Sequence, residues 1–351
     1  MRIAIIAPPW VSVPPRLYGG TEVVLDGLAR GLQAAGEDVL LYTTGDSTCP
    51  VPRAWVLPEA VGVGTSGSAT ELRHVVNAYD VVRAWGADVV HDHTLVGPVY
   101  ADRFDDVTVV TTNHGPFQSE LGDYYRAIGH RVPIIAISHH HASTAGEVPI
   151  AAVIHHGVDV EHYRPGPGDG GYAVFLGRMC AEKGVHTAIE VARAAGMPLK
   201  IAAKLQEAQE FAYFEHVVTP LLHDGVEFIG EVGGNDKQDL LGHARCLLNP
   251  VGWPEPFGMV MIESLACGTP VVATPNGSVP ELVDNGRTGF VGATETDLAN
   301  GLLRLDELDR GACRAAAVER FSIERMAADH LAVYEATAER RVRSHERLSV
   351  V

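Results

Sequence analysis

The sequence predicts an α/β protein made of two doubly wound parallel-sheet domains. Short apolar runs rich in valine and isoleucine alternate with longer segments of helical periodicity, which is the pattern of a parallel sheet covered by helices. The alternation is interrupted at residues 161–171 (EHYRPGPGDGG), where prolines and glycines indicate a linker. The length of 351 residues also exceeds the roughly 150 residues of a typical domain.

The first half of the chain begins with a predicted strand. Residues 2–8 (RIAIIAP) form an unbroken apolar run, as in a parallel strand buried on both faces. A loop rich in proline and glycine ends in YGGTE, and the helix that follows carries Val24, Leu28 and Leu32 on one face. Residues 62–68 (GVGTSGS) are expected to form a flexible loop. The same criteria predict a helix at 70–85 and strands at 38–45, 87–93, 107–115, 133–138 and 150–157.

The second half repeats this pattern. Its first predicted strand is 172–178 (YAVFLGR), and residues 322–348 are expected to form a helix that is apolar early and charged late. The helix after the first strand has one apolar face, formed by Val185, Ala188, Ile189 and Ala192. Further strands are predicted at 199–204, 226–232, 245–252, 269–274 and 288–292, with helices between them.

The composition is that of an ordinary globular protein. Hydrophobic residues make up 46% and charged residues 20% of the chain, enough for two cores. No apolar run approaches the ~20 residues of a membrane span. The start, MRIAIIAPPW, predicts a strand rather than a signal peptide, because two prolines follow a short apolar run. The net charge of −17 argues against nucleic acid and anionic membrane surfaces as partners.

The cysteines indicate the redox compartment. They are scattered and form no CxxC pair, which favours a reducing environment, so we expect a cytoplasmic protein. They are Cys49, Cys180, Cys246, Cys267 and Cys313.

The stretch LGRMCAEKG (176–184) places two cations at a turn from strand to helix. Arg178 ends the predicted strand, and Lys183 comes just before the helix. In open α/β sheets ligands bind beyond the carboxyl ends of the strands, so two such domains would share a site in the cleft between them. Cations beside a helix N-terminus suit a diphosphate, because the helix end adds N–H donors and partial positive charge.

The stretch EPFGMVMIES (255–264) has two glutamates separated by an apolar run. The N–H groups of Gly258, Met259 and Val260 would open a helix aimed at the same diphosphate. Glu263, one turn into that helix, can accept two hydroxyl hydrogen bonds, as from a ribose diol. Glu255 lies in the preceding loop, where it can reach sugar hydroxyls.

With these motifs the second half resembles glycosyltransferase family 4, the retaining enzymes of the GT-B fold. The resemblance covers nearly the whole chain, and its most specific element is the E-x7-E pair, Glu255 and Glu263. It implies that Glu263 binds the nucleotide ribose, that Glu255 faces the donor sugar, and that Arg178 and Lys183 hold the diphosphate. In FIGEV (228–232), it places the backbone near Val232 against the base.

The resemblance also implies an organisation into two Rossmann-like domains facing across a cleft. Residues 1–163 would form the acceptor-side domain and 172–324 the domain that binds the nucleotide sugar, joined by a linker at 164–171. A C-terminal helix at about 325–351 would pack back onto the first domain.

Two motifs in the first half agree with this assignment. LYGGTE (17–22) resembles the family's glycine pair, Gly19 and Gly20, whose backbone can approach the leaving phosphate. TTNHGP (111–116) places His114 at the carboxyl end of a strand, where relatives carry a histidine near the reacting sugar.

The other histidines raise the question of a metal. His91 and His93 in HDH share one face of a strand, whereas adjacent histidines point to opposite faces and chelate poorly. We expect these histidines to line the cleft or support the fold. No metal and no cofactor are expected, because the family's fold does not use a metal for catalysis and no suitable DxD motif is apparent.

Several alternatives remain open at the level of sequence. A sugar-nucleotide epimerase of the same fold and an inactive protein that binds nucleotide sugars would share most of these motifs. A dinucleotide-dependent dehydrogenase is disfavoured, because no G-x-G-x-x-G follows the first strand. UDP is the expected base by resemblance, with GDP or ADP as alternatives. The sequence leaves open the donor sugar, the acceptor, any contact of the acceptor with His91 or His93, and the oligomeric state.

Overall fold

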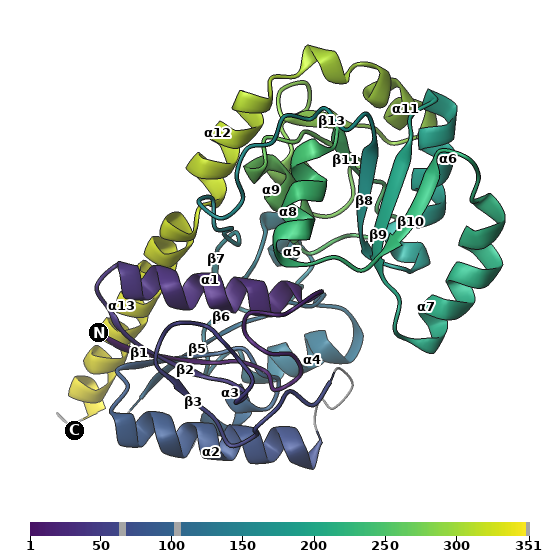
Figure 1. Ribbon diagram of the computed structural model, residues 1–351. Coiled ribbons are helices and arrows are strands. Elements are labelled where there is room, and N and C mark those ends of the chain that lie inside the picture. The colour runs from purple at the N-terminus through teal and green to yellow at the C-terminus, as the bar shows by residue number, and fades with distance from the viewer. Residues whose placement is uncertain (63–67, 102–106, 349–351) are drawn as a thin grey trace. The chain divides into compact units, whose positions relative to one another are not determined.

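The computed structural model describes residues 1–62, 68–101 and 107–348 (Figure 1). The chain divides into two compact units. Unit 1 comprises Met1–Gly157 together with the C-terminal segment from Ile323, and unit 2 comprises Val158–Ser322. Most of the predicted loop at 62–68 lies outside the described residues. Among the helices of the described ranges, none combines the length and the apolar character that a membrane span requires.

Unit 1 contains a parallel sheet whose described strands are β1 (Arg2–Ile6), β2 (Asp38–Tyr42), β3 (Arg53–Ala54), β4 (Val89–Asp92), β5 (Thr108–Thr112), β6 (Ile134–Ala136) and β7 (Ile150–Val153). Their order is β3-β2-β1-β4-β5-β6-β7. The helices are α1 (Gly20–Ala34), α2 (Ala69–Trp85), α3 (Gly97–Tyr100), α4 (Ser119–Ile128), α5 (His139–Ser143) and α13 (Ile323–Leu348). Every strand predicted for this half is present, and β3 is an addition.

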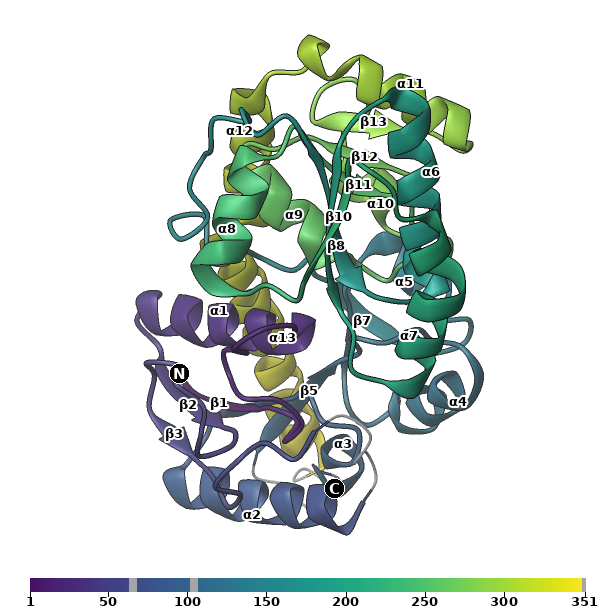
Figure 2. The same cartoon turned by 45° about the vertical axis from the view of Figure 1, so that its right-hand side comes forward.

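Both faces of this sheet are buried, which explains the unbroken apolar run of β1. Helix α1 lies on one face and α2 on the other (Figures 1 and 2). Helix α13 packs against α1 at a glycine, since a Cβ on Gly31 would lie 2.6 Å from the Ile323 side chain and 3.0 Å from Ala327. Any larger side chain at Gly31 would therefore push the C-terminal helix away.

Unit 2 contains a second parallel sheet, whose described strands are β8 (Ala173–Arg178), β9 (Leu199–Lys204), β10 (Val226–Gly230), β11 (Cys246–Asn249), β12 (Val271–Ala273) and β13 (Gly289–Val291). Their order is β10-β9-β8-β11-β12-β13. The longer helices are α6 (Val185–Ala195), α7 (Ala208–Tyr213), α8 (Gly234–His243), α9 (Met259–Ala266), α11 (Glu295–Leu303) and α12 (Arg310–Phe321), with a short α10 (Val279–Leu282). Helices α8 and α9 lie on one face, and α6 and α11 on the other (Figures 1 and 2).

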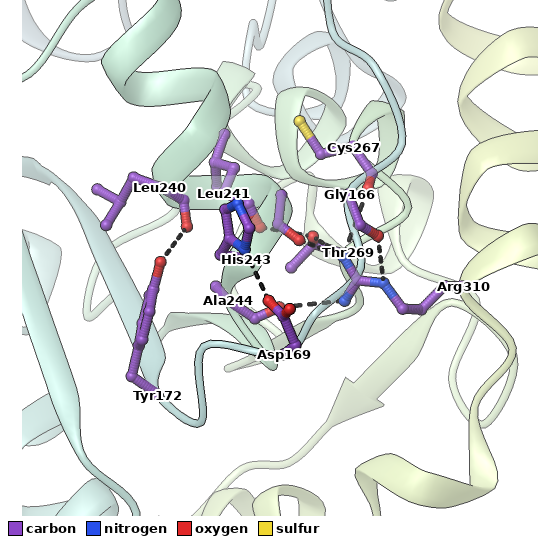
Figure 3. A network of polar contacts seen from close by, with 11 residues as sticks. Gly166, Asp169, Tyr172, Leu240, Leu241, His243, Ala244, Cys267, Thr269 and Arg310 are labelled. Atoms are coloured by element: carbon purple, nitrogen blue, oxygen red, sulfur yellow. Dashed lines mark hydrogen bonds and ion pairs between the residues drawn. The ribbon is translucent and has the colours of Figure 1, made fainter.

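Residues 164–171, for which the sequence predicts a linker, are hydrogen-bonded within unit 2. Arg310 donates to the carbonyl of Gly166 at 3.2 Å (Figure 3). It also donates to the carbonyl of Gly242 at 2.9 Å. Asp169 pairs with His243 at 2.7 Å. The division between the units accordingly falls at Gly157 and Val158, ahead of the predicted boundary.

The strand orders define one switch point in each sheet. In unit 1 the chain order reverses between β1 and β4, and in unit 2 it reverses between β8 and β11. Ligands of doubly wound sheets bind outside the carboxyl ends of the strands at such points. The residues that follow these four strands are therefore the first candidates for a functional site.

Candidate functional site

The turn after β8 is built around a glycine. Arg178 is the last residue of β8, and a short 3₁₀ helix, Ala181–Lys183, leads to Gly184. Gly184 has φ 75° and caps α6, and a Cβ there would overlap the carbonyl of Pro250. Only glycine fits this left-handed and crowded position. The turn thus holds Lys183 at the start of α6, as predicted from the sequence.

Lys183 forms an ion pair with Glu255. The same Glu255 oxygen, Oε2, accepts a hydrogen bond of 3.0 Å from Nε1 of Trp253. The side chains of Lys183 and Glu255 are only 14% and 12% exposed, so the two charges neutralise each other largely out of water. Arg178 approaches Glu182 at 3.7 Å. Two of the predicted site residues are therefore in direct contact at the switch point of unit 2.

The loop that carries Glu255 is fixed by the backbone of Gly277 and Ser278. The backbone N–H of Ser278 donates to the Glu255 carbonyl at 3.0 Å, and a Cβ on Gly277 would overlap that carbonyl. Gly258, with φ 92°, then caps α9. Helix α9 begins at Met259, as predicted, so the N–H groups of Met259 and Val260 lack partners within the helix, whereas that of Met261 donates to the Gly258 carbonyl at 3.1 Å.

Glu263 is buried in α9 and is held by two side chains. Its Oε1 accepts a hydrogen bond of 2.8 Å from the Tyr163 hydroxyl and an ion pair of 2.7 Å from Nζ of Lys237. Glu263 is 2% exposed. Burial of Tyr163, together with the neighbouring charge of Glu263, raises the pKa of Tyr163 well above its usual value. Sequence reasoning missed Lys237, because a lysine in a polar stretch of helix ordinarily faces solvent. Val232 is partly exposed and precedes α8, the helix that carries Lys237.

In unit 1 the glycine pair lies where α1 begins. Gly19 caps the helix, and a Cβ there would come within 2.7 Å of Pro15, whereas a Cβ on Gly20 would meet no atom within 4 Å. Gly20 therefore leaves open space beside the backbone.

Two buried carboxyl groups of unit 1 have raised pKa values. Burial raises the pKa of Glu22, in α1, to about 7, and it raises the pKa of Asp92, in β4, to about 6.

His114 belongs to a group of five histidines in unit 1. Its Nε2 lies 2.9 Å from Nδ1 of His93, and its ring stacks on another ring at 5.2 Å between centroids. The rings of His91 and His93 are 3.9 Å apart, which confirms that these two side chains share one face. The histidine cluster comprises His91, His93, His114, His156 and His330.

Burial keeps the histidine cluster neutral. With smaller effects from His141 and His330, burial lowers the pKa of His114 to about 3. It lowers the pKa of His330 to about 4, and the pKa values of the other three members well below the usual value. The described residues contain no group of three or more His, Cys, Asp or Glu side chains arranged to hold a metal ion.

Comparison with known proteins identifies the family. The model "Glycosyltransferase Family 4" matches residues 18–162, and the model "Glycosyl transferases group 1" matches residues 164–317. The chain belongs to glycosyltransferase family 4. This glycosyltransferase is 25% identical to the phosphatidyl-myo-inositol mannosyltransferase of Mycobacterium leprae, over 96% of its own chain and 97% of that protein.

Solved structures share the fold of this glycosyltransferase. AviGT4, a glycosyltransferase involved in avilamycin A biosynthesis, has a TM-score of 0.74 and 25% identity over 96% of this chain and 98% of the other. HepE of Anabaena, solved in complex with UDP-glucose, has a TM-score of 0.73 and 20% identity over 97% of this chain and 100% of the other. The two parallel-sheet units thus form the GT-B fold predicted from the sequence.

Proposed function

We propose that this glycosyltransferase transfers a sugar, with retention of anomeric configuration and without a metal, from a nucleoside-diphosphate sugar to a hydroxyl acceptor. The observation that carries the proposal is the contact of Lys183 with Glu255 at the switch point of unit 2. A cation suited to a diphosphate there touches a carboxylate suited to sugar hydroxyls. UDP is the proposed base, and the UDP-glucose complex of HepE supports this choice.

The donor diphosphate would be held by charge and by backbone. Arg178 and Lys183 supply two positive charges, of which that of Lys183 is shared with Glu255, and the first-turn amides of α9 at Gly258, Met259 and Val260 add N–H donors. Together these groups can meet the negative charge that a divalent cation meets in other transferases, which is the basis for proposing a metal-independent reaction.

Two further contacts would orient the nucleotide. Glu263 would bind the ribose diol, and the backbone near Val232 would meet the base. Glu255 would hold the donor sugar. His114 is proposed to contact the reacting sugar, and the backbone of Gly19 and Gly20 to approach the leaving phosphate. We assign no base or nucleophile among these residues.

The proposed reaction is a front-face displacement. The bond from the sugar C1 to the diphosphate oxygen breaks, and the electron pair leaves with the diphosphate. The acceptor oxygen bonds to C1 on the same face, and its proton passes to the departing diphosphate. No covalent enzyme intermediate is needed, so the protein contributes position and charge stabilisation.

The unpaired cysteines of the chain favour a reducing compartment, and we propose that the reaction is cytoplasmic.

A donor screen tests this function. The protein is incubated with UDP-, GDP- and ADP-sugars, with and without EDTA, and both the thermal shift and the slow release of the nucleoside diphosphate are measured. A transferase should be stabilised by one donor and cleave it slowly in EDTA, releasing the sugar with its original anomeric configuration. Conversion to a second nucleotide sugar would indicate an epimerase, and stabilisation without cleavage would indicate a binding protein. Stabilisation by none of the donors would overturn the proposal.

A further inference from the structure

The contact between His93 and His114 determines which ring nitrogen of His114 carries the proton. We propose that His93 is a positioning residue that donates its Nδ1–H to Nε2 of His114, so that His114 presents an Nδ1–H donor to the substrate. This inference rests on the proposed function only for the identity of that substrate. Its basis is the 2.9 Å distance between the two nitrogens.

His93 is itself rigidly held at the switch point of unit 1. Its backbone N–H donates to the carbonyl of Ile6, the last residue of β1, at 3.0 Å. Its ring lies against His91, with 3.9 Å between centroids. His91 is fixed in turn by Tyr334 at 2.7 Å and by Thr112 at 2.8 Å. These contacts fix the orientation of the His93 ring, with its Nδ1 atom pointing toward His114.

The other ring nitrogen of His93 decides the direction of the hydrogen bond. Nε2 of His93 is buried and has no hydrogen-bond partner among the described residues. If His114 were the donor, the proton of neutral His93 would sit on Nε2 as a buried N–H without an acceptor. If His93 is the donor, Nε2 carries only a lone pair. Buried N–H groups without partners are rarer than buried acceptors without partners, so His93 is assigned as the donor.

The consequence for His114 is a defined role. Because its Nε2 lone pair is occupied, its proton lies on Nδ1, the remaining ring nitrogen. The low pKa of His114, about 3, keeps the ring neutral at neutral pH. Such a ring donates a hydrogen bond to a sugar or phosphate oxygen and offers no free lone pair to take the acceptor proton. His114 is therefore a hydrogen-bond donor in this site, and not a general base.

NMR of the protein labelled with ¹⁵N-histidine tests the assignment directly. The ring signals of His114 are identified by their loss in His114→Gln. We expect Nδ1 of His114 to show the shift of a protonated ring nitrogen and Nε2 that of an unprotonated one. The reverse pattern, or a cationic ring at neutral pH, would overturn the assignment whether or not the protein has transferase activity.

Two variants of His93 separate positioning from packing. His93→Leu removes the donor and should convert His114 to the Nε2–H form or to a mixture, and kcat should fall about tenfold with the donor KM unchanged, as for loss of one hydrogen bond. His93→Asn keeps a donor near the position of Nδ1 and should retain the wild-type spectrum. An unchanged His114 spectrum in His93→Leu would show that His93 only fills space.

His74 provides the matched control. It is a buried histidine of the same unit, and its Nε2 bonds the Ala7 carbonyl at 2.9 Å. His74→Leu removes an equal number of atoms and should leave the His114 signals in place. Failure of every nucleotide sugar to bind would refute the proposed function but would not alter the His114 spectrum, so the two failures are distinguishable.

Discussion

Breaking the Lys183–Glu255 pair should destabilise unit 2 more than breaking an exposed ion pair. Each side chain is about seven-eighths buried, at 14% and 12% exposed, so Lys183→Met leaves the Glu255 carboxylate without its cation in a poorly hydrated position. Loss of one partner of a fully buried pair costs about 3–5 kcal/mol. We take the lower end, about 3 kcal/mol, because some solvent reaches both groups and Trp253 still donates to Glu255.

Thermal unfolding followed by tryptophan fluorescence measures this change. Trp253 is the tryptophan of unit 2 and touches the pair, so it reports on the correct unit. A loss of about 3 kcal/mol corresponds to a fall in Tm of roughly 6–12 °C for a domain of this size. Turnover of Lys183→Met should fall about a hundredfold, the scale of losing a charge-stabilising group.

The double variant Lys183→Met/Glu255→Gln makes the test decisive. It removes both charges, so it should recover most of the lost Tm while turnover stays low. A double variant no more stable than Lys183→Met would show that the two charges are not coupled. Wild-type Tm in the single variant would refute the reasoning from burial. The exposed pair of Arg304 with Glu307 serves as the control, and Arg304→Met should change Tm little.

Three further predictions concern other parts of the chain. Glu263→Ala should raise the Kd of UDP at least tenfold in calorimetry, and an unchanged Kd would remove the ribose role. Arg310→Ala should speed hydrogen exchange across 164–171, because the Gly166 carbonyl and the Gly242 carbonyl, which accepts from Gly168, lose their contact with the guanidinium. Equal exchange would contradict the role of Arg310 in holding this segment, and Arg304→Ala is the control. The pKa values of the histidine cluster are lower in the folded than in the unfolded state. Its contribution to stability is therefore present above pH ~6.5 and is lost as pH falls toward the folded-state pKa values. The free energy of unfolding should fall by about 1 kcal/mol per histidine over the first pH unit below 6.5. The two buried carboxyl groups with raised pKa values oppose this trend but are outnumbered, so urea unfolding should weaken below pH ~6.5, with a smaller slope in His330→Phe; a flat profile would contradict the assignment.

The helices and strands were predictable because the pattern that indicates each one lies within its own residues. The apolar run of β1 needs no distant contact to indicate a strand buried on both faces, and the face of α6 shows in its own spacing. Strand β3, Arg53–Ala54, was missed because two residues carry no periodicity. It pairs with β2 through backbone alone, which any side chain allows.

The linker shows where local reading stops. Prolines and glycines correctly indicate irregular backbone at 164–171, but composition does not reveal what holds it. Arg310 donates to the Gly166 carbonyl, and it lies more than a hundred residues later in the chain, at the first position of α12. The backbone N–H groups of Gly166, Gly168 and Gly170 donate to the carbonyls of Cys267, Gly242 and His243. The sequence signal of a flexible segment and that of a segment held by residues distant in the chain are the same, because the difference lies in tertiary contacts.

The predicted site shows the same division between residue type and partner. The spacing of Glu255 and Glu263 indicated two carboxylates in an apolar setting, but not that each would be paired with a lysine from another element. Lys183 neutralises Glu255, and Lys237 neutralises Glu263. A buried carboxylate without such a partner would be costly, so the lysines let both glutamates stay buried. In the proposed function, a diphosphate that reaches Lys183 would meet a cation already shared with Glu255. Donor binding would then redistribute an existing charge contact, and the attraction left for the diphosphate would depend on Arg178 and on the amides at the start of α9.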